Sequence, residues 1–426
     1  MMEWGSTMGM TITEKILALH SGRRNVRPGE FIEAEVDLVL ANDITAPIAI
    51  EVFKRLARKR LFSKDRVVLV ADHFVPNKDI ASAEQVRMMR EFAMEYSIKN
   101  YFELVDSGIE HVILPEKGLV KAGDLVVGAD SHTCTYGALG AFSTGVGSTD
   151  LGVTMATGRI WLRVPHSIKI VYKGRPGRWI GGKDLILATL KILKVDGAIY
   201  KALEFAGEGI RYLSMADRFT MANMAVEAGA KNGIFEPDNI TIEYLKDRID
   251  VPYKVLNSDR DAQYEKVIDI DLNSIEPQIA LPHSPDNVAP VSEVKDVKID
   301  QVFIGSCTNG RIEDLRVASQ VLKGKRVLKG LRLIIIPGSQ QIYKKALSEG
   351  LLDIFINAGA IICPPTCGPC LGGHMGLLAK GEVCLSTSNR NFRGRMGHPE
   401  SEIYLCGPAV AAASSITGKI TSPEEL

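Results

Sequence analysis

The chain has 426 residues, 46% of them hydrophobic and 24% charged, so it can bury large cores and should divide into two or three domains. Lysine plus arginine equals aspartate plus glutamate at 51 each, which leaves no overall charge to attract nucleic acid or an anionic membrane. No run approaches roughly 18 apolar residues, and the N-terminal residues lack an export signal, so we expect a cytoplasmic protein without a membrane-spanning segment. Residues 1–9 are expected to form a loose terminus.

The first part of the chain alternates short β-branched runs with amphipathic stretches. We expect strands at 66–73, 111–115 and 124–132 and a helix at 84–97. This alternation predicts an α/β layer structure with parallel strands, in which functional residues occupy loops at the C-terminal ends of strands. A change of pattern near residue 165 predicts a first domain over residues 1–165.

The middle of the chain, residues 166–295, is expected to form a second domain. It contains a predicted strand at 166–174 and two predicted helices at 183–194 and 215–230. A polar, proline-containing stretch at 273–296 then indicates a linker.

The α/β pattern resumes after this linker and predicts a third domain over residues 296–426. Its expected strands lie at 298–307, 332–339, 360–365 and 382–388.

Seven cysteines are thinly spread along the chain, an odd number that favours thiols, metal ligands or core residues over a disulfide framework. Cys307 follows an apolar run and precedes a helix-forming stretch. Cys367 and Cys370 lie in "PTCGPCLGG", a loop rigidified by prolines and opened by glycines. Two such loops at neighbouring strand ends could bring three sulfurs together. The other four cysteines are expected to be structural: Cys134, Cys363, Cys384 and Cys406.

Three thiolates match a [4Fe–4S] cluster in which one iron has no protein ligand and can act as a Lewis acid. The residues alone also allow a zinc site with His374 as fourth ligand. A radical S-adenosylmethionine pattern, formed with Cys363, is disfavoured because only 56 residues follow Cys370. A redox dithiol is disfavoured because the motif is late in the chain and bound by prolines.

The loop at 386–399 is short and polar and follows an apolar strand. It carries Arg390, Arg393 and Arg395 together with Asn389 and Asn391. Guanidinium groups bind carboxylates through paired hydrogen bonds, so this loop suits a polycarboxylate substrate. A solvated basic turn is the structural alternative.

Acid–base candidates fall into two groups. His73, His111 and His132 are each expected at a strand end, two of them beside Asp72 or Asp130, which could orient the imidazole. Asn223 and Glu227 are spaced i and i+4 and are expected on one face of a helix, where they could reach a buried polar centre. For each of these residues a structural or surface role is the alternative.

Taken together, seven segments resemble the aconitase superfamily, and most closely the large subunits of 3-isopropylmalate dehydratase and homoaconitase. They span nearly the whole chain in the same order: 41–50, 71–79, 128–142, 222–230, 303–316, 365–376 and 386–399. The resemblance implies three α/β/α domains and a [4Fe–4S] cluster held by Cys307, Cys367 and Cys370.

The resemblance also implies the roles of residues around the cluster. The acid–base residues would be Asp72, His73, His111, Asp130, His132 and Glu227, and the substrate-binding residues would be Asn42, Asn223, Asn389, Arg390 and Arg395.

Single-chain members of the superfamily have a fourth, swivelling domain that supplies a serine base and an arginine, and no such segment is found before the chain ends at "SPEEL". The resemblance therefore implies a separate small subunit. It further implies a hydro-lyase that isomerises isopropylmalate by dehydration and rehydration in leucine biosynthesis. The alternatives are homoaconitase and, less favoured, 2,3-dimethylmalate dehydratase, aconitase or an RNA-binding relative, which the balanced charge disfavours.

Overall fold

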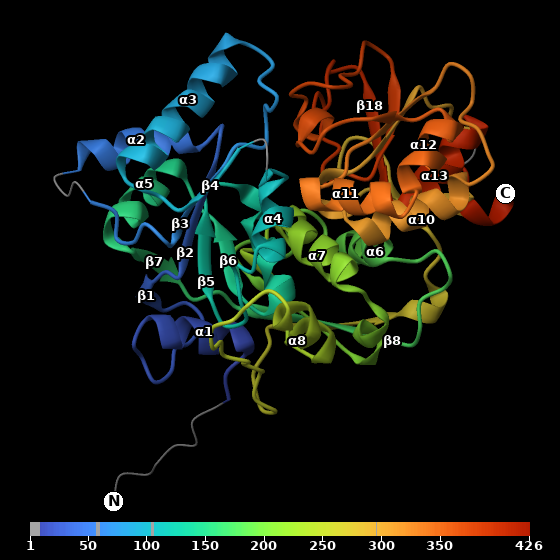
Figure 1. The fold of residues 1–426 in the computed structure, drawn as a ribbon. Helices are drawn as coiled ribbons and strands as arrows, with labels where there is room; N and C mark the ends of the chain where they lie inside the picture. The colour runs from blue at the N-terminus through green and yellow to red at the C-terminus, as the bar shows by residue number, and fades with distance from the viewer. Residues whose placement is uncertain (1–8, 57–59, 104–105, 295) are drawn as a thin grey trace, which may run out of the picture.

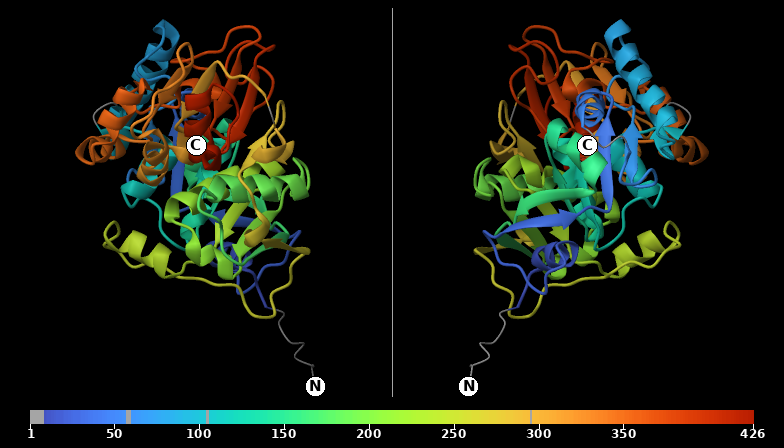
Figure 2. Two further views of the ribbon diagram at one scale, coloured as in Figure 1. Left: turned by 90° about the vertical axis from the view of Figure 1, so that its right-hand side faces the viewer. Right: turned by 90° about the vertical axis from the view of Figure 1, so that its left-hand side faces the viewer.

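The computed structural model describes residues 9–56, 60–103, 106–294 and 296–426. Most of the expected loose terminus lies outside these residues. Gly9 is described, and its N–H donates to Asp261 Oδ2 at 3.1 Å. The three larger β-sheets lie around a centre that holds α4 (Glu110–Glu116) and α7 (Met215–Met224), while α3 (Ile80–Glu95) and α8 (Asn239–Lys246) lie at the periphery (Figures 1 and 2).

The first sheet is fully parallel and has the strand order β4-β3-β2-β5-β6. Its strands are β2 (Leu38–Asn42), β3 (Val67–Val70), β4 (Asn100–Phe102), β5 (Leu125–Gly128) and β6 (Phe142–Gly145). The helices of this part are α1 (Ile12–His20), α2 (Ala46–Arg55), α3, α4 (Glu110–Glu116) and α5 (Ser148–Thr157).

Strand β2 is buried along its whole length because helices cover both faces of this sheet. Alternate side chains point to opposite faces. Val39 packs in the hydrophobic cluster that includes residues of α1, α2, α3 and α5, whereas Leu40 packs against residues of α4 and α7. Figure 1 shows α2, α3 and α5 on the outer side of the sheet and α4 and α7 on the side facing the rest of the molecule.

The second sheet is also parallel, with the order β10-β9-β8-β11. Its strands are β8 (Ser167–Lys173), β9 (Ala202–Ala206), β10 (Asn232–Phe235) and β11 (Lys266–Asp271), and its helices are α6 (Gly182–Leu193), α7 (Met215–Met224) and α8. A separate antiparallel ribbon pairs β1 (Phe31–Glu35) with β7 (Arg159–Arg163).

The third sheet has the order β13-β12-β18-β17-β14-β15-β16 and is parallel except for its β13-β12-β18 end. Its strands are β12 (Gln278–Ala280), β13 (Val288–Pro290), β14 (Gln301–Ile304), β15 (Arg332–Ile335), β16 (Ile361–Ile362), β17 (Val383–Ser386) and β18 (Glu402–Cys406). Its helices are α9 (Ser306–Asn309), α10 (Ile312–Leu322), α11 (Gln340–Ser348), α12 (Leu351–Ala358) and α13 (Pro408–Thr417).

Three local expectations differ from the structure. Residues 111–115, expected as a strand, lie in helix α4. The stretch 273–296, expected as a linker, contains β12 and β13 and extends the third sheet, so this sheet begins before residue 296. The helix expected over 215–230 is regular only to Met224 and continues as a 3-10 turn over Ala225–Ala228. The domain boundaries at 165 and 295 stay predictions.

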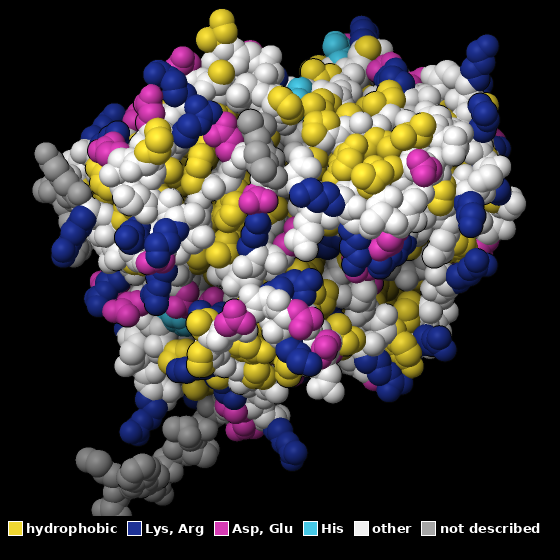
Figure 3. Space-filling model, in the orientation of Figure 1, with side chains coloured by type: hydrophobic (Ala, Val, Ile, Leu, Met, Phe, Trp, Pro, Cys, Tyr) yellow, Lys and Arg dark blue, Asp and Glu magenta, His cyan; other side chains and the backbone are white. Residues whose placement is uncertain are grey.

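The surface carries no large area of one charge on the face shown in Figure 3, where basic and acidic side chains are interspersed. Within the described residues, we find no helix with the length and apolarity needed to cross a bilayer.

A partly buried ion pair joins α1 to the first sheet. His20 Nε2 lies 2.6 Å from Asp37 Oδ2, which also accepts the Leu125 N–H at 2.9 Å. Burial opposes charge on both groups, but their mutual hydrogen bond and charge attraction, together with backbone hydrogen bonds, outweigh it, raising the pKa of His20 above 6.5 and lowering that of Asp37 below 3.8. The pair therefore stabilises the fold fully between about pH 3.8 and 6.5. Its contribution is lost as pH rises through the raised His20 pKa or falls through the lowered Asp37 pKa.

We expect His20→Gln to lower the free energy of unfolding by about 1 kcal/mol at pH 6 and by less at pH 9, because the contribution of the charged imidazole is lost as pH rises through the raised His20 pKa. Thermal unfolding of parent and variant at the two pH values measures this. His166→Gln is the matched control, because His166 is exposed. Equal destabilisation at both pH values would show that packing, and not charge, is the contribution of His20.

Candidate active site

Most of the predicted site residues lie at or just after the C-terminal end of a parallel strand. Asn42 is the last residue of β2, Asp72 follows β3, and Asp130 follows β5. Cys307 follows β14, and Arg390 follows β17. Because such loops gather at one edge of each sheet, the first and third sheets bring them to a common cavity of about 230 Å³.

The cavity is lined by residues of both sheets. Those predicted from the sequence are Asn42, Asp72, His73, His111, Asp130, His132, Cys307, Cys367, Cys370, Asn389, Arg390 and Arg395. Asn223 and Glu227 do not line it and instead contact residues that do. The i, i+4 helical face expected for these two residues is replaced by the 3-10 turn after α7.

The three thiols sit in tightly built loops. Cys307 is 6% exposed and follows Ser306, which has a left-handed φ of 75° that turns the chain sharply after β14. The side-chain amides of Asn223 and Asn389 donate to Cys307 Sγ at 3.2 and 3.4 Å. Burial raises the pKa of the Cys307 thiol to about 12, and a bound metal centre would favour its thiolate form.

This donor set fits an iron–sulfur cluster better than a zinc ion. Among the described residues, the three-ligand groups within 4.8 Å are Asp72–His73–Cys367 and His73–Glu110–Asp130, and the three thiols do not form one. Thiolates that share a tetrahedral zinc lie about 3.8 Å apart. Soft sulfur donors at wider spacing around one cavity, with amide donors to sulfur, suit a cluster.

The other candidate ligands lie elsewhere. Cys363 packs half-buried beside a hydrophobic cluster, and its N–H donates to Ile335 O at 3.0 Å. His374 Nε2 lies 3.2 Å from the His73 carbonyl oxygen and does not line the cavity. The structure therefore supports neither the Cys363-based pattern nor His374 as a fourth ligand.

The Asp72–His73 pair is held by a buried carboxylate that the sequence interpretation overlooked. Asp43 accepts the backbone N–H groups of Asp72 and His73 at 3.0 and 2.9 Å. His73 Nδ1 lies 2.6 Å from Asp72 Oδ1. Burial alone would lower the pKa of His73, but the Asp72 charge and hydrogen bond raise it well above 6.5. The pair can therefore hold a proton at the cavity wall.

A second acid–base group centres on Asp130. His111 Nε2 lies 2.9 Å from Asp130 Oδ1, which also accepts the backbone N–H of His132 at 2.7 Å. Burial would raise the pKa of Asp130, but the hydrogen bonds from these histidines hold it well below 3.8. Burial lowers the pKa of His111. An ionised carboxylate thus orients a neutral imidazole that can accept a proton.

Glu227 connects this group to the third sheet. Its carboxylate lies 2.9 Å from His132 Nε2 and accepts from Arg390 Nε at 2.8 Å. Burial would raise the pKa of Glu227, but these two partners lower it. The remaining edge of the Arg390 guanidinium donates to Ser131 Oγ at 3.0 Å.

Two residues of the polar loop do not take part. Arg393 is exposed and does not line the cavity, and Asn391 donates to the backbone oxygens of Leu281 and Ile403. Arg395 lines the cavity, so the candidates of this loop for binding a carboxylate are Asn389, Arg390 and Arg395.

Besides Asp43, sequence reasoning missed three functional candidates. Glu110 and Ser131 line the cavity, and their positions beside His111 and His132 were the only signals. Lys183 is fully buried, and its Nζ donates to the carbonyls of Thr387 and Ser388 at 2.8 and 2.7 Å.

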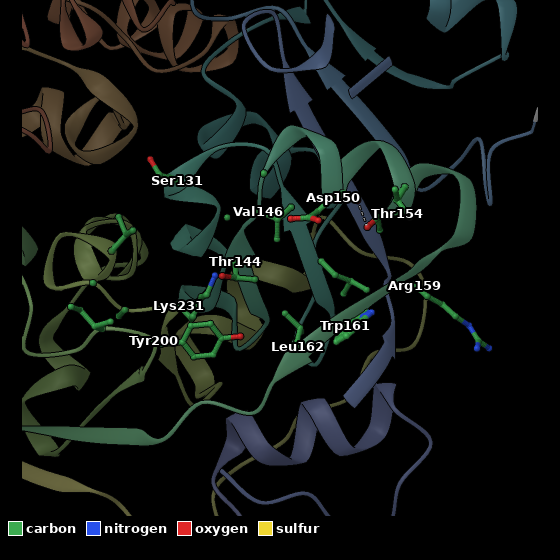
Figure 4. Close-up of a pocket in the computed structure, with 18 residues that line it drawn as sticks. Ser131, Thr144, Val146, Asp150, Thr154, Arg159, Trp161, Leu162, Tyr200 and Lys231 are labelled. Carbon is green, nitrogen blue, oxygen red and sulfur yellow. Dashed lines mark hydrogen bonds between the residues drawn. The ribbon is translucent and has the colours of Figure 1, made fainter. Parts of the chain in front are cut away.

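A second hollow of about 990 Å³ begins beside the cavity, with Ser131 at one end and Trp161 and Arg159 toward the other (Figure 4). Lys231 and Tyr200 lie together in it, and Trp161 is 66% exposed.

The family model described as "Aconitase family (aconitate hydratase)" matches residues 14–296 and 292–418. The chain therefore belongs to the aconitase family. The fold is similar to the crystal structure of Thermococcus kodakaraensis aconitase X in its holo-form, with a TM-score of 0.50, 14% identity and coverage of 92% of this chain and 93% of that one.

Several relatives match along their whole length. The chain is 62% identical to the 3-isopropylmalate dehydratase large subunit of Moorella thermoacetica, over 98% of this chain and 100% of that protein. It is 61% identical to the protein of the same name from Thermodesulfovibrio yellowstonii and 60% identical to that from Clostridium beijerinckii, each with the same coverage.

We expect Cys307→Ser to lose bound iron and sulfide, because this thiol faces the cavity and two amides orient it. Cys363→Ser should keep its full content of iron and sulfide, because Cys363 does not line the cavity. Iron and acid-labile sulfide are measured after anaerobic reconstitution. If Cys363→Ser lost iron and Cys307→Ser kept it, the third cluster ligand would have to be reassigned from Cys307 to Cys363.

Proposed function

We propose that this chain is the large subunit of a 3-isopropylmalate dehydratase, which converts 2-isopropylmalate into 3-isopropylmalate by losing and re-adding water in leucine biosynthesis. The observation that carries the proposal is the 60–62% identity to such large subunits over nearly the full length of both chains. The cavity supports it, because guanidinium and amide groups that suit a dicarboxylate surround acid–base pairs and three thiols.

We assign a [4Fe–4S] cluster, with one iron free of protein ligands, to Cys307, Cys367 and Cys370. When bound, the cluster would supply a Lewis acid for the hydroxyl that leaves. Asn223 and Asn389 would hold the sulfur of Cys307 in place through their amide hydrogen bonds.

The remaining side chains are assigned to proton transfer and substrate binding. Asp72 with His73, and His111 with Asp130 and His132, would hold the proton that the departing hydroxide takes up. Arg390 and Arg395 would bind substrate carboxylates, assisted by Asn42 and Asn389. Glu227 would keep Arg390 and His132 oriented.

We further propose a separate small subunit, because the relatives are named large subunits. By the resemblance to the aconitase superfamily, this subunit would supply a serine base and another arginine. We also propose that the protein acts in the cytoplasm, a reducing compartment in which its seven cysteines, all free in the structure, would stay thiols.

The proposal is tested by anaerobic reconstitution of the chain with the small subunit of the same genome. We expect turnover of isopropylmalate with kcat/KM at least about tenfold above that for homoaconitate or citrate, since a pocket tuned to one substituent discriminates by about this factor. Equal or better turnover of homoaconitate would contradict the proposed substrate. The large subunit alone, equally loaded with iron, is the control for the partner.

Lys183 generates a further prediction, because it joins α6 to the loop that carries Asn389 and Arg390. Lys183→Met removes both hydrogen bonds to the Thr387 and Ser388 carbonyls. We expect kcat/KM for isopropylmalate to fall about 10- to 100-fold, as is typical when a residue that orients a site is lost.

Lys191→Met on the same helix is the matched control, because Lys191 is exposed. Unchanged kcat/KM in a correctly folded Lys183→Met protein would contradict a positioning role for Lys183.

A further inference from the structure

Glu110 is a buried acid at the cavity wall with one unsatisfied oxygen. The residue lines the cavity and is 1% exposed, and one of its carboxylate oxygens lies within 4.8 Å of ligand atoms of His73 and Asp130. Oε1 accepts a hydrogen bond from Asn42 Nδ2 at 3.0 Å, whereas Oε2 has no hydrogen-bond partner within the described part of the chain. A buried polar atom without a partner is costly, so Oε2 marks a place where a ligand atom belongs.

The hydrogen bonds of Asn42 determine which oxygen of Glu110 carries a proton. Asn42 Oδ1 accepts from the N–H groups of Ile44 and Thr45 at 3.1 and 3.2 Å. The other amide atom is therefore the NH₂ group, and it donates to Glu110 Oε1. Oε1 is thus the acceptor oxygen, and a proton on this carboxyl group resides on Oε2.

The charged groups around Glu110 favour its neutral form. Asp72 Oδ2 accepts the Glu110 N–H at 2.7 Å, and Asp130 is the second nearby carboxylate. The two nearby imidazoles, His73 and His111, are hydrogen-bonded to Asp72 and Asp130 at 2.6 and 2.9 Å, and His111 Nε2 also lies 3.5 Å from Glu110 Oε1. Burial and then the charges of Asp72 and Asp130 raise the pKa of Glu110 well above 4.5, because together they outweigh the opposing effects of the His73 charge and the Asn42 hydrogen bond.

We propose that Glu110 works as a neutral carboxylic acid whose Oε2–H donates a hydrogen bond to an oxygen of the bound hydroxy diacid. The identity of that substrate rests on the proposed function. The role is distinct from that of the Asp–His pairs, since Glu110 holds its proton throughout and contributes binding and orientation.

Glu110→Gln and Glu110→Met test this role in the reconstituted two-subunit enzyme. Glutamine presents the same acceptor to Asn42 and an N–H donor in place of Oε2–H, so we expect KM for isopropylmalate within about threefold of the parent. Methionine has similar length and no donor, so KM should rise at least about tenfold. If Glu110 acted as an ionised base or a metal ligand, Glu110→Gln would be as impaired as Glu110→Met, and the inference would be wrong.

Infrared difference spectra give a readout independent of turnover. We expect a protonated-carboxyl band that shifts when substrate binds and is missing in Glu110→Gln. A band that is absent from the parent, or that does not respond to substrate, would overturn the proposal. Iron content and circular dichroism verify that each variant is loaded and folded, and Glu116→Gln on the same helix is the matched control.

The two proposals fail in different ways. If the parent complex turns over another hydroxy acid instead of isopropylmalate, the proposed function is wrong, and the Glu110 variants are compared with that acid. If the parent turns over isopropylmalate but Glu110→Gln behaves like Glu110→Met, only the Glu110 inference is wrong.

Discussion

The carboxylate of Glu227 is the point at which the three parts of the chain meet. Glu227 follows α7 in the second part, His132 comes from the first part, and Arg390 from the third. A buried charge that loses a partner costs about 3–5 kcal/mol, so this carboxylate can be satisfied only when all three parts take one relative position. The site is therefore a product of the packing between sheets.

Buried cations extend this constraint to the backbone of the site loops. Arg311 donates to the Cys307 carbonyl at 2.6 Å and to the His111 carbonyl at 3.1 Å, which ties the first cysteine loop to α4. Its guanidinium also lies over the Phe219 ring of α7, 4.5 Å from the ring centroid. Lys183 likewise donates to a backbone carbonyl, that of Thr387, and so ties the loop after β17 to α6. Each cation thus helps to satisfy backbone carbonyls that border the site: Arg311 those of Cys307 and His111, and Lys183 those of Thr387 and Ser388.

Much of the site could be predicted from the sequence because parallel strands put their C-terminal loops at one edge. Asp72, Asp130 and Cys307 each follow an apolar run, and the structure places all three at the cavity. His111 also reaches the cavity, but from helix α4, because "HVILP" suits a buried helix as well as a strand.

Other features depend on tertiary contacts that no local pattern records. Lys183 resembles any lysine at the start of a helix until its contact with a loop some 204 residues away is known. The strands β12 and β13 are short, and their stability comes from pairing with each other and with β18 at the edge of the sheet, so the polar, proline-containing sequence around them indicated only a linker.

In this chain the site loops are positioned by protein groups, whereas in small metal-binding domains the metal itself positions its ligands. In such domains the metal ligands fold only when the metal binds. Here hydrogen bonds within the chain hold three loops in place. Asp43 binds the loop after β3, Arg311 binds the segment after β14 that carries Cys307, and Lys183 binds the loop after β17 that carries Arg390. Hydrogen bonds within the chain thus fix the loops that carry the proposed acid–base and carboxylate-binding groups, and a cluster bound by the three thiols would add a Lewis acid to these loops.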